Sequence, residues 1–314
     1  MSFLKGKVPS KRIRATAISG IVVIILIAFA VMWLYNGYKE YEAAQAEAER
    51  ASRLMAVHYI DIGQGDATLI KSPSGKFMLI DCGMTTSGHY LKKYLWDMGV
   101  EKLDYLIITH PHEDHYGGAP EIMDNFGVEE LLLHRDFVYT FPYDKFIDMA
   151  HDIGIGVTLV SKGDKFEFDG CAEFEFIAPE YTDADDYNES SLGFRFVYGD
   201  TSFMFTGDAE ADSEYYMLKS GKPLEADVYK AGHHGSSTSN TKDFVEAVNP
   251  KYAVVSCGRN NDYGHPHREI VSLFKELGIE MLVTHETGGV VFVSDGTEVE
   301  YKKDFNIISK KPET

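Results

Sequence analysis

The chain of 314 residues is 44% apolar, which is enough to bury one sizeable core, and it carries 30 basic against 49 acidic side chains. The formal net charge of −19 repels polyanions and counts against a surface that binds nucleic acid non-specifically, although a local groove or bound metal ions can reverse the sign at one site. Cys82, Cys171 and Cys257 are widely spaced, which excludes a readable disulfide framework or cysteine zinc site, and we expect all three to be packing residues.

The N-terminal segment predicts a membrane anchor. Residues 1–14 include five basic side chains, and residues 15–35 then run without a charge. An apolar helix of about 20 residues spans the hydrocarbon core of a bilayer, and this run is too long for the core of a cleaved signal peptide. The positive-inside rule places residues 1–14 in the cytoplasm. We therefore expect a transmembrane helix over residues 15–38, single-pass localisation in the cell membrane, and an extracellular catalytic domain.

Beyond the anchor, the pattern predicts a stalk and one α/β domain. Residues 39–55 are rich in Ala and Glu, which is typical of an exposed helix. From residue 56 short β-rich runs alternate with turns, among them a strand over 281–286, and amphipathic helices are expected near 143–153, 210–220, 242–248 and 267–277. This predicts a domain over residues 56–303, built from two sheets enclosed by helices, and a tail over 304–314. Strand counting alone does not separate this arrangement from other large α/β folds.

Three histidines and an aspartate follow the apolar strand at 103–108. The loop at 109–115 reads T-H-P-H-E-D-H, so that His110, His112, Asp114 and His115 form the pattern H-x-H-x-D-H. Imidazole nitrogens and carboxylate oxygens suit zinc, manganese or iron. His110 and His112 can face one ion while Asp114 and His115 turn toward a second. The loop therefore predicts half of a dinuclear metal site, at the end of a strand where α/β proteins commonly form sites.

This motif resembles that of the metallo-β-lactamase superfamily, and the resemblance extends over about residues 56–300. It implies an αββα sandwich and a hydrolase that uses water activated by one or two divalent ions, zinc or manganese. It also implies that Asp81, in L-I-D-C-G, orients the ligand loop from behind the ligands. Asp208, in F-T-G-D, is implied as the carboxylate that bridges both ions.

Three further elements are similar to those of ComEC competence proteins. The run A-G-H-H-G-S at 231–236 resembles an element shared with phosphorylcholine esterases, and it implies His234 as a metal ligand, His233 as its near alternative, and Ser236 as a substrate contact. The run D-I-G-Q-G-D-A at 61–67 resembles a second element, with an ordinary Gly-rich hairpin as the alternative. The third, Y-G-H-P at 263–266, places His265 in the cleft as a substrate ligand, a proton donor or an additional metal ligand.

The sequence departs from the superfamily at one expected ligand. Other members have one more metal-binding histidine between the histidine loop and T-G-D, but here only His134 and His151 lie in that interval, and neither has the expected context. Asn188, in N-E-S-S-L, lies where that ligand would fall and resembles the N-x-S-S-L of ComEC-like domains. The first metal site is then weak, empty or completed by water.

These residues predict hydrolysis of phosphodiesters. We expect Asp208 to hold the attacking water beside Asp114, with His233 or His265 stabilising charge or protonating the leaving oxygen. The likeness to ComEC implies DNA processing, but a second apolar run of about 18 residues is lacking, which excludes a complete transporter. The expected function is a membrane-anchored phosphodiesterase or nuclease that acts on DNA or a cell-envelope polymer, with no protein partner. The alternatives are an envelope phosphorylcholine-type esterase, a β-lactamase, and a non-catalytic binding module.

Overall fold

The computed structural model describes residues 11–135, 143–181 and 186–303. The chain divides into two compact units, Met1–Ser52 and Arg53–Thr314. The predicted tail at 304–314 and the first ten residues of the predicted basic segment lie outside the described residues.

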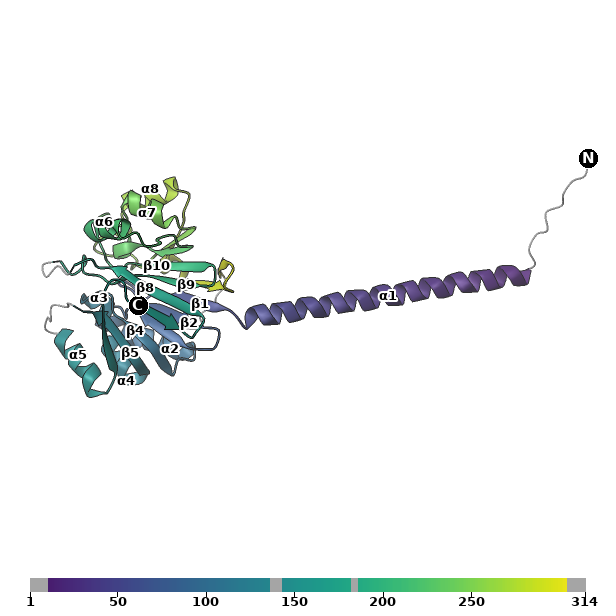
Figure 1. Cartoon of the computed structure of the whole chain (residues 1–314), viewed down its shortest axis with the longest axis horizontal. Coiled ribbons are helices and arrows are strands. Elements are labelled where there is room, and N and C mark those ends of the chain that lie inside the picture. The colour runs from purple at the N-terminus through teal and green to yellow at the C-terminus, as the bar shows by residue number, and fades with distance from the viewer. Residues whose placement is uncertain (1–10, 136–142, 182–185, 304–314) are drawn as a thin grey trace, which may run out of the picture. The chain divides into compact units, whose positions relative to one another are not determined.

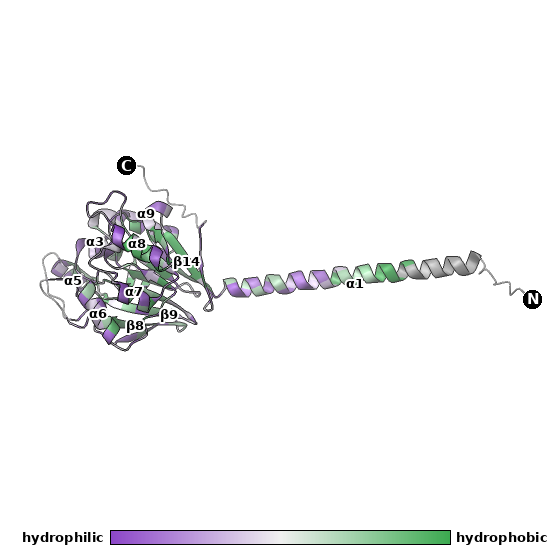
Figure 2. Cartoon of the chain, turned by 90° about the horizontal axis from the view of Figure 1, so that it is seen from above, coloured by the Kyte–Doolittle hydropathy of each residue, from purple (hydrophilic) through white to green (hydrophobic). Residues whose placement is uncertain are grey.

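The described part of the first unit is one helix, α1 (Lys11–Ala51). Among its described side chains, the apolar stretch runs from Val22 to Tyr35 and gives way to the charged residues of 39–50, as the colouring of Figure 2 shows. Across the ranges that the structure describes, no helix combines the length and the apolar character needed to cross a bilayer. The predicted transmembrane helix over residues 15–38 is therefore wrong, and so is the single-pass membrane localisation with an extracellular domain.

The second unit contains two mixed β-sheets. The strands of the first sheet, in spatial order, are β15 (Val299–Tyr301), β14 (Val290–Ser294), β1 (Met55–Tyr59), β2 (Thr68–Lys71), β3 (Phe77–Ile80), β4 (Lys102–Ile107), β5 (Gly127–His134) and β6 (Gly156–Val160). Those of the second are β13 (Glu280–Val283), β12 (Tyr252–Val255), β11 (Val228–Lys230), β10 (Thr201–Phe205), β9 (Gly193–Tyr198), β8 (Ala172–Ala178) and β7 (Lys165–Phe168). Strands β3 to β6 are parallel, and so are β10 to β13.

Helices cover the outer face of each sheet, and Figure 1 shows the resulting four layers. The first sheet is covered by α2 (Gly88–Asp97), α4 (Ala119–Asn125) and α5 (Tyr143–Asp152), and the second by α6 (Ala211–Lys219), α7 (Lys242–Val248) and α8 (Arg268–Glu276). Between the sheets lies a core rich in aromatic rings, including Phe174, Phe196 and Phe203. Burial of large apolar side chains in three stacked cores holds the layers together. The predicted α/β class with a sandwich of two helix-covered sheets is confirmed.

The parallel strands position the loops that carry the predicted motifs. Strands β3 and β4 of one sheet, and β10, β11 and β12 of the other, are each followed by one of these loops. Because parallel strands present their carboxyl ends at one edge of a sheet, the loops gather at that edge of the sandwich.

Some local predictions differ from the structure. The strand expected over 281–286 ends at Val283, because Thr284–Thr287 forms the short helix α9, which ends at Gly288 in a left-handed conformation (φ 72°) that favours glycine. The short helices η1 (Thr85–Ser87), α3 (Glu113–Tyr116) and η2 (Gly232–Gly235) were not expected either. Cys82 and Cys257 are buried, but Cys171 is exposed in the turn before β8, so its assignment as a packing residue is wrong.

Candidate metal centre

The histidine loop after β4 is anchored from behind by Asp81. This carboxylate accepts hydrogen bonds from the backbone N–H and the hydroxyl of Thr109, each at 2.8 Å, and its Oδ2 lies 2.8 Å from Nδ1 of His115. Asp81 is buried and follows β3 with a positive φ of 58°. Because Nδ1 of His115 donates to Asp81, loss of the Nε2 proton leaves the lone pair on Nε2, and that atom lies 3.3 Å from Oδ2 of Asp208.

Four side chains from both sheets meet at one point. Nε2 of His234, which follows β11, lies 3.2 Å from Oδ2 of Asp114 and 3.5 Å from Oδ2 of Asp208. Nε2 of His115 lies 4.0 Å from Oδ1 of Asp114. In tetrahedral zinc coordination, with bonds of about 2.0–2.1 Å, neighbouring ligand atoms lie roughly 3.3 Å apart. Asp114, His115 and His234 offer ligand atoms that all lie within 4.8 Å of one another, and this group, with Asp208 beside both imidazoles, can hold one cation.

His110 and His112 lie on the other side of Asp208. Nε2 of His110 lies 3.0 Å from Nδ1 of His112 and 3.9 Å from Oδ2 of Asp208. His110, His115 and Asp208 offer ligand atoms that all lie within 4.8 Å of one another. His110 is buried whereas His112 is half-buried. His112 pairs with His110, whereas Asp114 pairs with His234, and His115 lies within reach of both groups. The predicted division of these residues between two ions stays a prediction.

The electrostatics of the centre also fit a cation. Burial disfavours the charged forms of His115 and His234, but Asp208 and the other carboxylates outweigh burial, so the pKa of each imidazole lies well above its usual value. Burial likewise opposes ionisation of Asp208, but His115 and His234 hold its pKa well below the usual range. Nε2 of both imidazoles and Oδ1 of Asp208 are buried without a well-aligned hydrogen bond. A divalent ion can replace the two imidazolium protons and satisfy the same atoms.

Comparison with known proteins identifies the family. Residues 60–259 match the model of the metallo-β-lactamase superfamily. The chain belongs to this superfamily. It is 32% identical over 253 residues to ComE operon protein 3 of Bacillus subtilis, in a match that covers 75% of this chain and 32% of that protein. The chain thus spans about a third of the length of the curated relatives it matches, and the predicted likeness to the ComEC branch is confirmed.

Two solved structures show the same superfamily fold. Igni18, a metallo hydrolase from the archaeon Ignicoccus hospitalis, aligns with a TM-score of 0.51 and 17% identity, covering 76% of this chain and 98% of that one. CmlA, a diiron β-hydroxylase from Streptomyces venezuelae, aligns with a TM-score of 0.50 and 16% identity, covering 74% of this chain and 53% of that one. At such identities the likeness concerns the fold alone. Membership of the superfamily and the donor set of the site support a metal-dependent hydrolase.

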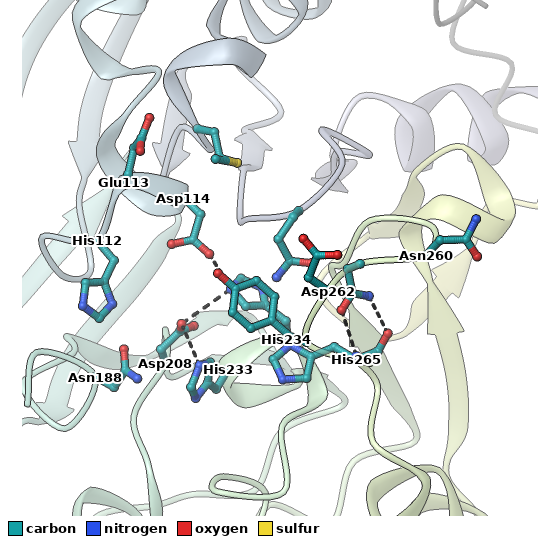
Figure 3. Close-up of a pocket in the computed structure, with 14 residues that line it drawn as sticks. His112, Glu113, Asp114, Asn188, Asp208, His233, His234, Asn260, Asp262 and His265 are labelled. Atoms are coloured by element: carbon teal, nitrogen blue, oxygen red, sulfur yellow. Dashed lines mark hydrogen bonds and ion pairs between the residues drawn. The ribbon is translucent and has the colours of Figure 1, made fainter. Parts of the chain in front are cut away.

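The departure from the superfamily at Asn188 is visible in the site. Asn188 lies beside Asp208 and near His112 (Figure 3), and its Nδ2 donates to Oε1 of Glu210 at 3.3 Å. Among the described residues, no group of His, Cys, Asp and Glu that could hold a metal includes a further histidine on this side beyond His110 and His115. Asn188 thus lines the cavity near His112, and its place as the substitute for a metal-binding histidine stays a prediction.

His233 and His265 line the cavity above the centre, but they differ in their surroundings. Nδ1 of His233 lies 3.1 Å from Oε1 of Glu210, and its Nε2 lies 3.7 Å from Oδ2 of Asp208. The ring of His265 lies 5.6 Å from that of His233 and stacks on Tyr263 at 5.6 Å and 18°. Burial, and then His234 and His233, lower the pKa of His265 to about 4. His265 is therefore neutral at neutral pH.

Four predicted site residues do not line the cavity: Asp81, His110 and His115, which are buried in or behind the metal centre, and Ser236, whose side chain lies apart from it. Ser236 is the one of these four whose side chain, among the described residues, forms no ion pair or hydrogen bond with another member of the centre. It is buried, and its hydroxyl lies 3.0 Å from that of Thr238, which in turn donates to Glu210 at 2.9 Å. Its predicted contact with a substrate stays a prediction.

The cavity has a volume of about 620 Å³ and opens over the centre (Figure 3). Sequence reasoning missed several of its residues: Gln64, Met84, Glu113, Asn260, Asn261, Asp262 and Tyr263. Glu210 was also missed, although it follows T-G-D by two residues. Two missed residues beneath the cavity, Asp66 and Lys230, lie inside or next to quoted motifs, and only the packing of the sheets shows that they touch.

Proposed function

We propose that this chain is a metal-dependent phosphodiesterase whose centre is formed by Asp114, His115, Asp208 and His234, with His110 and His112 on its second side. The observation that carries the proposal is the convergence, at the floor of the cavity, of buried ligand atoms that have no well-aligned hydrogen bond. A divalent ion held there, zinc or manganese, supplies positive charge that lowers the pKa of water and stabilises charge on a phosphate.

The surrounding side chains supply positioning and proton transfer. Asp208 faces both sides of the centre and accepts the hydrogen bond of the attacking water. His233 is assigned as the proton donor to the leaving oxygen, because its Nδ1 lies 3.1 Å from Oε1 of Glu210, which holds the ring with Nε2 toward Asp208. His265, with its lowered pKa, serves as a neutral hydrogen-bonding group toward the substrate.

The cavity lining favours a substrate with one negative charge on phosphorus. Among the described residues that line it, none is lysine or arginine, whereas Glu113 and Asp262 add carboxylates beyond the metal centre. A dianionic monoester or a polyphosphate would meet more repulsion here than a diester with a single charge. The ring of Tyr263, 65% exposed, offers a platform on which a nucleobase can stack. A nucleic acid diester is therefore the first substrate class that we propose.

Replacement of Asp208 by Ala tests the proposal. With bis-p-nitrophenyl phosphate and single-stranded DNA as substrates, and added zinc or manganese, D208A should lose turnover by a factor of roughly 10² to 10³, the order found when one principal charge-stabilising group is removed. Equal turnover in wild type and D208A would overturn the mechanism. A wild-type chain that binds no metal and hydrolyses neither substrate would instead indicate a non-catalytic binding module.

A second candidate is a phosphorylcholine-type esterase. An exposed aromatic ring next to carboxylates attracts a quaternary ammonium group, and Tyr263 and Asp262 line the cavity together. p-Nitrophenyl phosphorylcholine distinguishes the two candidates. If the chain hydrolyses it faster than bis-p-nitrophenyl phosphate and leaves DNA intact, the esterase replaces the nuclease.

A further inference from the structure

Asp66 and Lys230 form an ion pair that is buried next to His234. Nζ of Lys230 lies 2.9 Å from Oδ2 of Asp66, and the two side chains are 3% and 6% exposed. The other carboxylate oxygen, Oδ1, lies 3.3 Å from Nδ1 of His234. We propose that this pair is a positioning device, in which the negative charge of Asp66 beside Nδ1 of His234 keeps the proton on that atom, so that Nε2 faces Asp114 and Asp208 as a metal ligand. The inference rests on the proposed function of the same centre.

The backbone of Asp66 ties the same point to two other segments of the site. Its N–H donates to the carbonyl of Asp114 at 3.1 Å, and its carbonyl accepts from the N–H of Gly83 at 2.8 Å. The preceding Gly65 has a φ of +118°, and a Cβ there would lie 2.4 Å from the carbonyl oxygen of Asp114. Only glycine allows this approach. The run at 61–67 is thus a junction of the ligand loops rather than an ordinary hairpin.

Lys230 determines which role Asp66 can take. Asp66, Asp208 and His234 offer ligand atoms within 4.8 Å of one another, so that Asp66 is itself a possible metal ligand. Because Nζ of Lys230 lies 2.9 Å from Oδ2, that oxygen is engaged, and Oδ1 is the one that faces His234.

The pair also joins the two halves of the sandwich. Asp66 precedes β2 in the eight-stranded sheet, and Lys230 ends β11 in the seven-stranded sheet. Nζ of Lys230 additionally donates to the carbonyl of Ala231 at 2.9 Å, just ahead of the two histidines. A buried charge pair therefore sets the distance between a loop of one sheet and the histidine segment of the other.

One alternative explains the position of His234 without Asp66. The carbonyl oxygen of Ser256 lies 2.9 Å from Nδ1 of His234 and accepts its hydrogen bond, whereas Oδ1 of Asp66 has no well-aligned hydrogen bond. If that carbonyl alone orients the ring, the ion pair contributes only to the stability of the fold. The experiment must therefore measure the metal site rather than stability alone.

The main test replaces the pair by apolar side chains. The double variant Asp66→Leu/Lys230→Met removes the carboxylate and both charges together, a change that folded proteins often tolerate. In the full chain, stripped of metal, Zn²⁺ affinity is measured by competition with a chelator, and the visible absorption of Co²⁺ reports the ligand geometry. We expect a loss of Zn²⁺ affinity of roughly 10- to 100-fold, the usual effect of removing a group that orients a ligand, together with a changed Co²⁺ spectrum.

Matched variants separate positioning from stability. K230R keeps the charge and should retain wild-type affinity. D227N changes a carboxylate just before β11 that accepts a backbone N–H of Ser202, away from the site, and it should also leave affinity unchanged. A folded double variant with wild-type affinity and spectrum overturns the proposal, and so does wild-type behaviour of D66N, which serves if the double variant does not fold. A wild-type chain without Zn²⁺ affinity would instead overturn the proposed function itself.

Discussion

The two sides of the metal centre differ in how firmly they are built. On the closed side, formed by Asp114, His115 and His234, both imidazoles are buried and have Nδ1 against a buried acceptor. On the open side, formed by His110, His112 and Asn188, His112 is half-buried and the two imidazoles face each other at 3.0 Å. Fixed tautomers and buried carboxylates predispose the closed side to bind an ion tightly. The open side adjoins the cavity and is suited to a weaker ion that acts together with the substrate.

The largest loss of activity is expected from a substitution that disrupts the closed side. H234A should lose turnover of bis-p-nitrophenyl phosphate by roughly 10³-fold and lose the tighter metal ion, because Nε2 of His234 contacts both Asp114 and Asp208. H112A should lose only about tenfold, with the tighter ion kept, because its side of the centre retains His110 and Asp208. Metal content by mass spectrometry and steady-state kinetics check both variants. Equal losses would show that the two sides do not differ.

A second prediction concerns the support beneath the closed side. Buried Glu214 accepts the backbone N–H groups of Asn240 and Thr241 at 2.6 and 2.8 Å, and the side chain of Asn240 bonds both N–H and C=O of Gly232, next to the paired histidines. Burial raises the pKa of Glu214 from 4.5 to about 7. The folded state thus binds this proton more tightly than the unfolded state.

The sign of the pH dependence follows from that pKa. A raised carboxyl pKa stabilises the fold fully below pH 4.5, and this contribution is lost as the pH rises toward 7. The loss amounts to about 3 kcal/mol of unfolding free energy. In urea unfolding experiments between pH 4.5 and 8, the free energy of unfolding should decline less steeply with pH in E214Q than in wild type. Identical slopes would place the pKa of Glu214 near its ordinary value.

The sequence predicted contiguous features better than features that depend on packing. The helix at 242–248 was placed from periodicity alone. The motifs H-x-H-x-D-H and T-G-D could also be recognised, because each carries its metal-ligating side chains on one loop at the end of a strand. Helix α4 was missed because it begins within G-G-A-P, which favours a turn, although proline is well suited to the first turn of a helix. The pairing of Asp66 with Lys230 could not be predicted, because each lies on a different sheet and only the stacked layers bring them together.

The third prediction concerns a substitution that adds a metal ligand to the open side. N188H should supply the imidazole that other members of the superfamily have in this region, and it should raise the affinity for a second Zn²⁺ roughly tenfold. Titration of a metal-stripped chain by calorimetry checks the second binding step, with N188A as the control for loss of the amide. If N188H leaves that step unchanged, the weakness of the open side does not arise from position 188.

The smallest predicted effect concerns the cavity wall beside His265, whose ring lies 6.1 Å from that of His234. Tyr263 stacks on His265 at the cavity wall and leaves 65% of its surface exposed, so that a nucleobase attached to the reacting phosphate can rest on its outer face. Such a contact contributes about 1 kcal/mol at the low end of measured stacking energies, or roughly fivefold in kcat/KM. Y263A should therefore lose about fivefold in kcat/KM with a dinucleotide, whereas Y263F should retain its activity. With bis-p-nitrophenyl phosphate, whose small rings do not need the platform, neither variant should differ from wild type. Equal losses of Y263A with both substrates would assign Tyr263 to the support of His265 instead, and the cavity would then hold the phosphate without a role for the base.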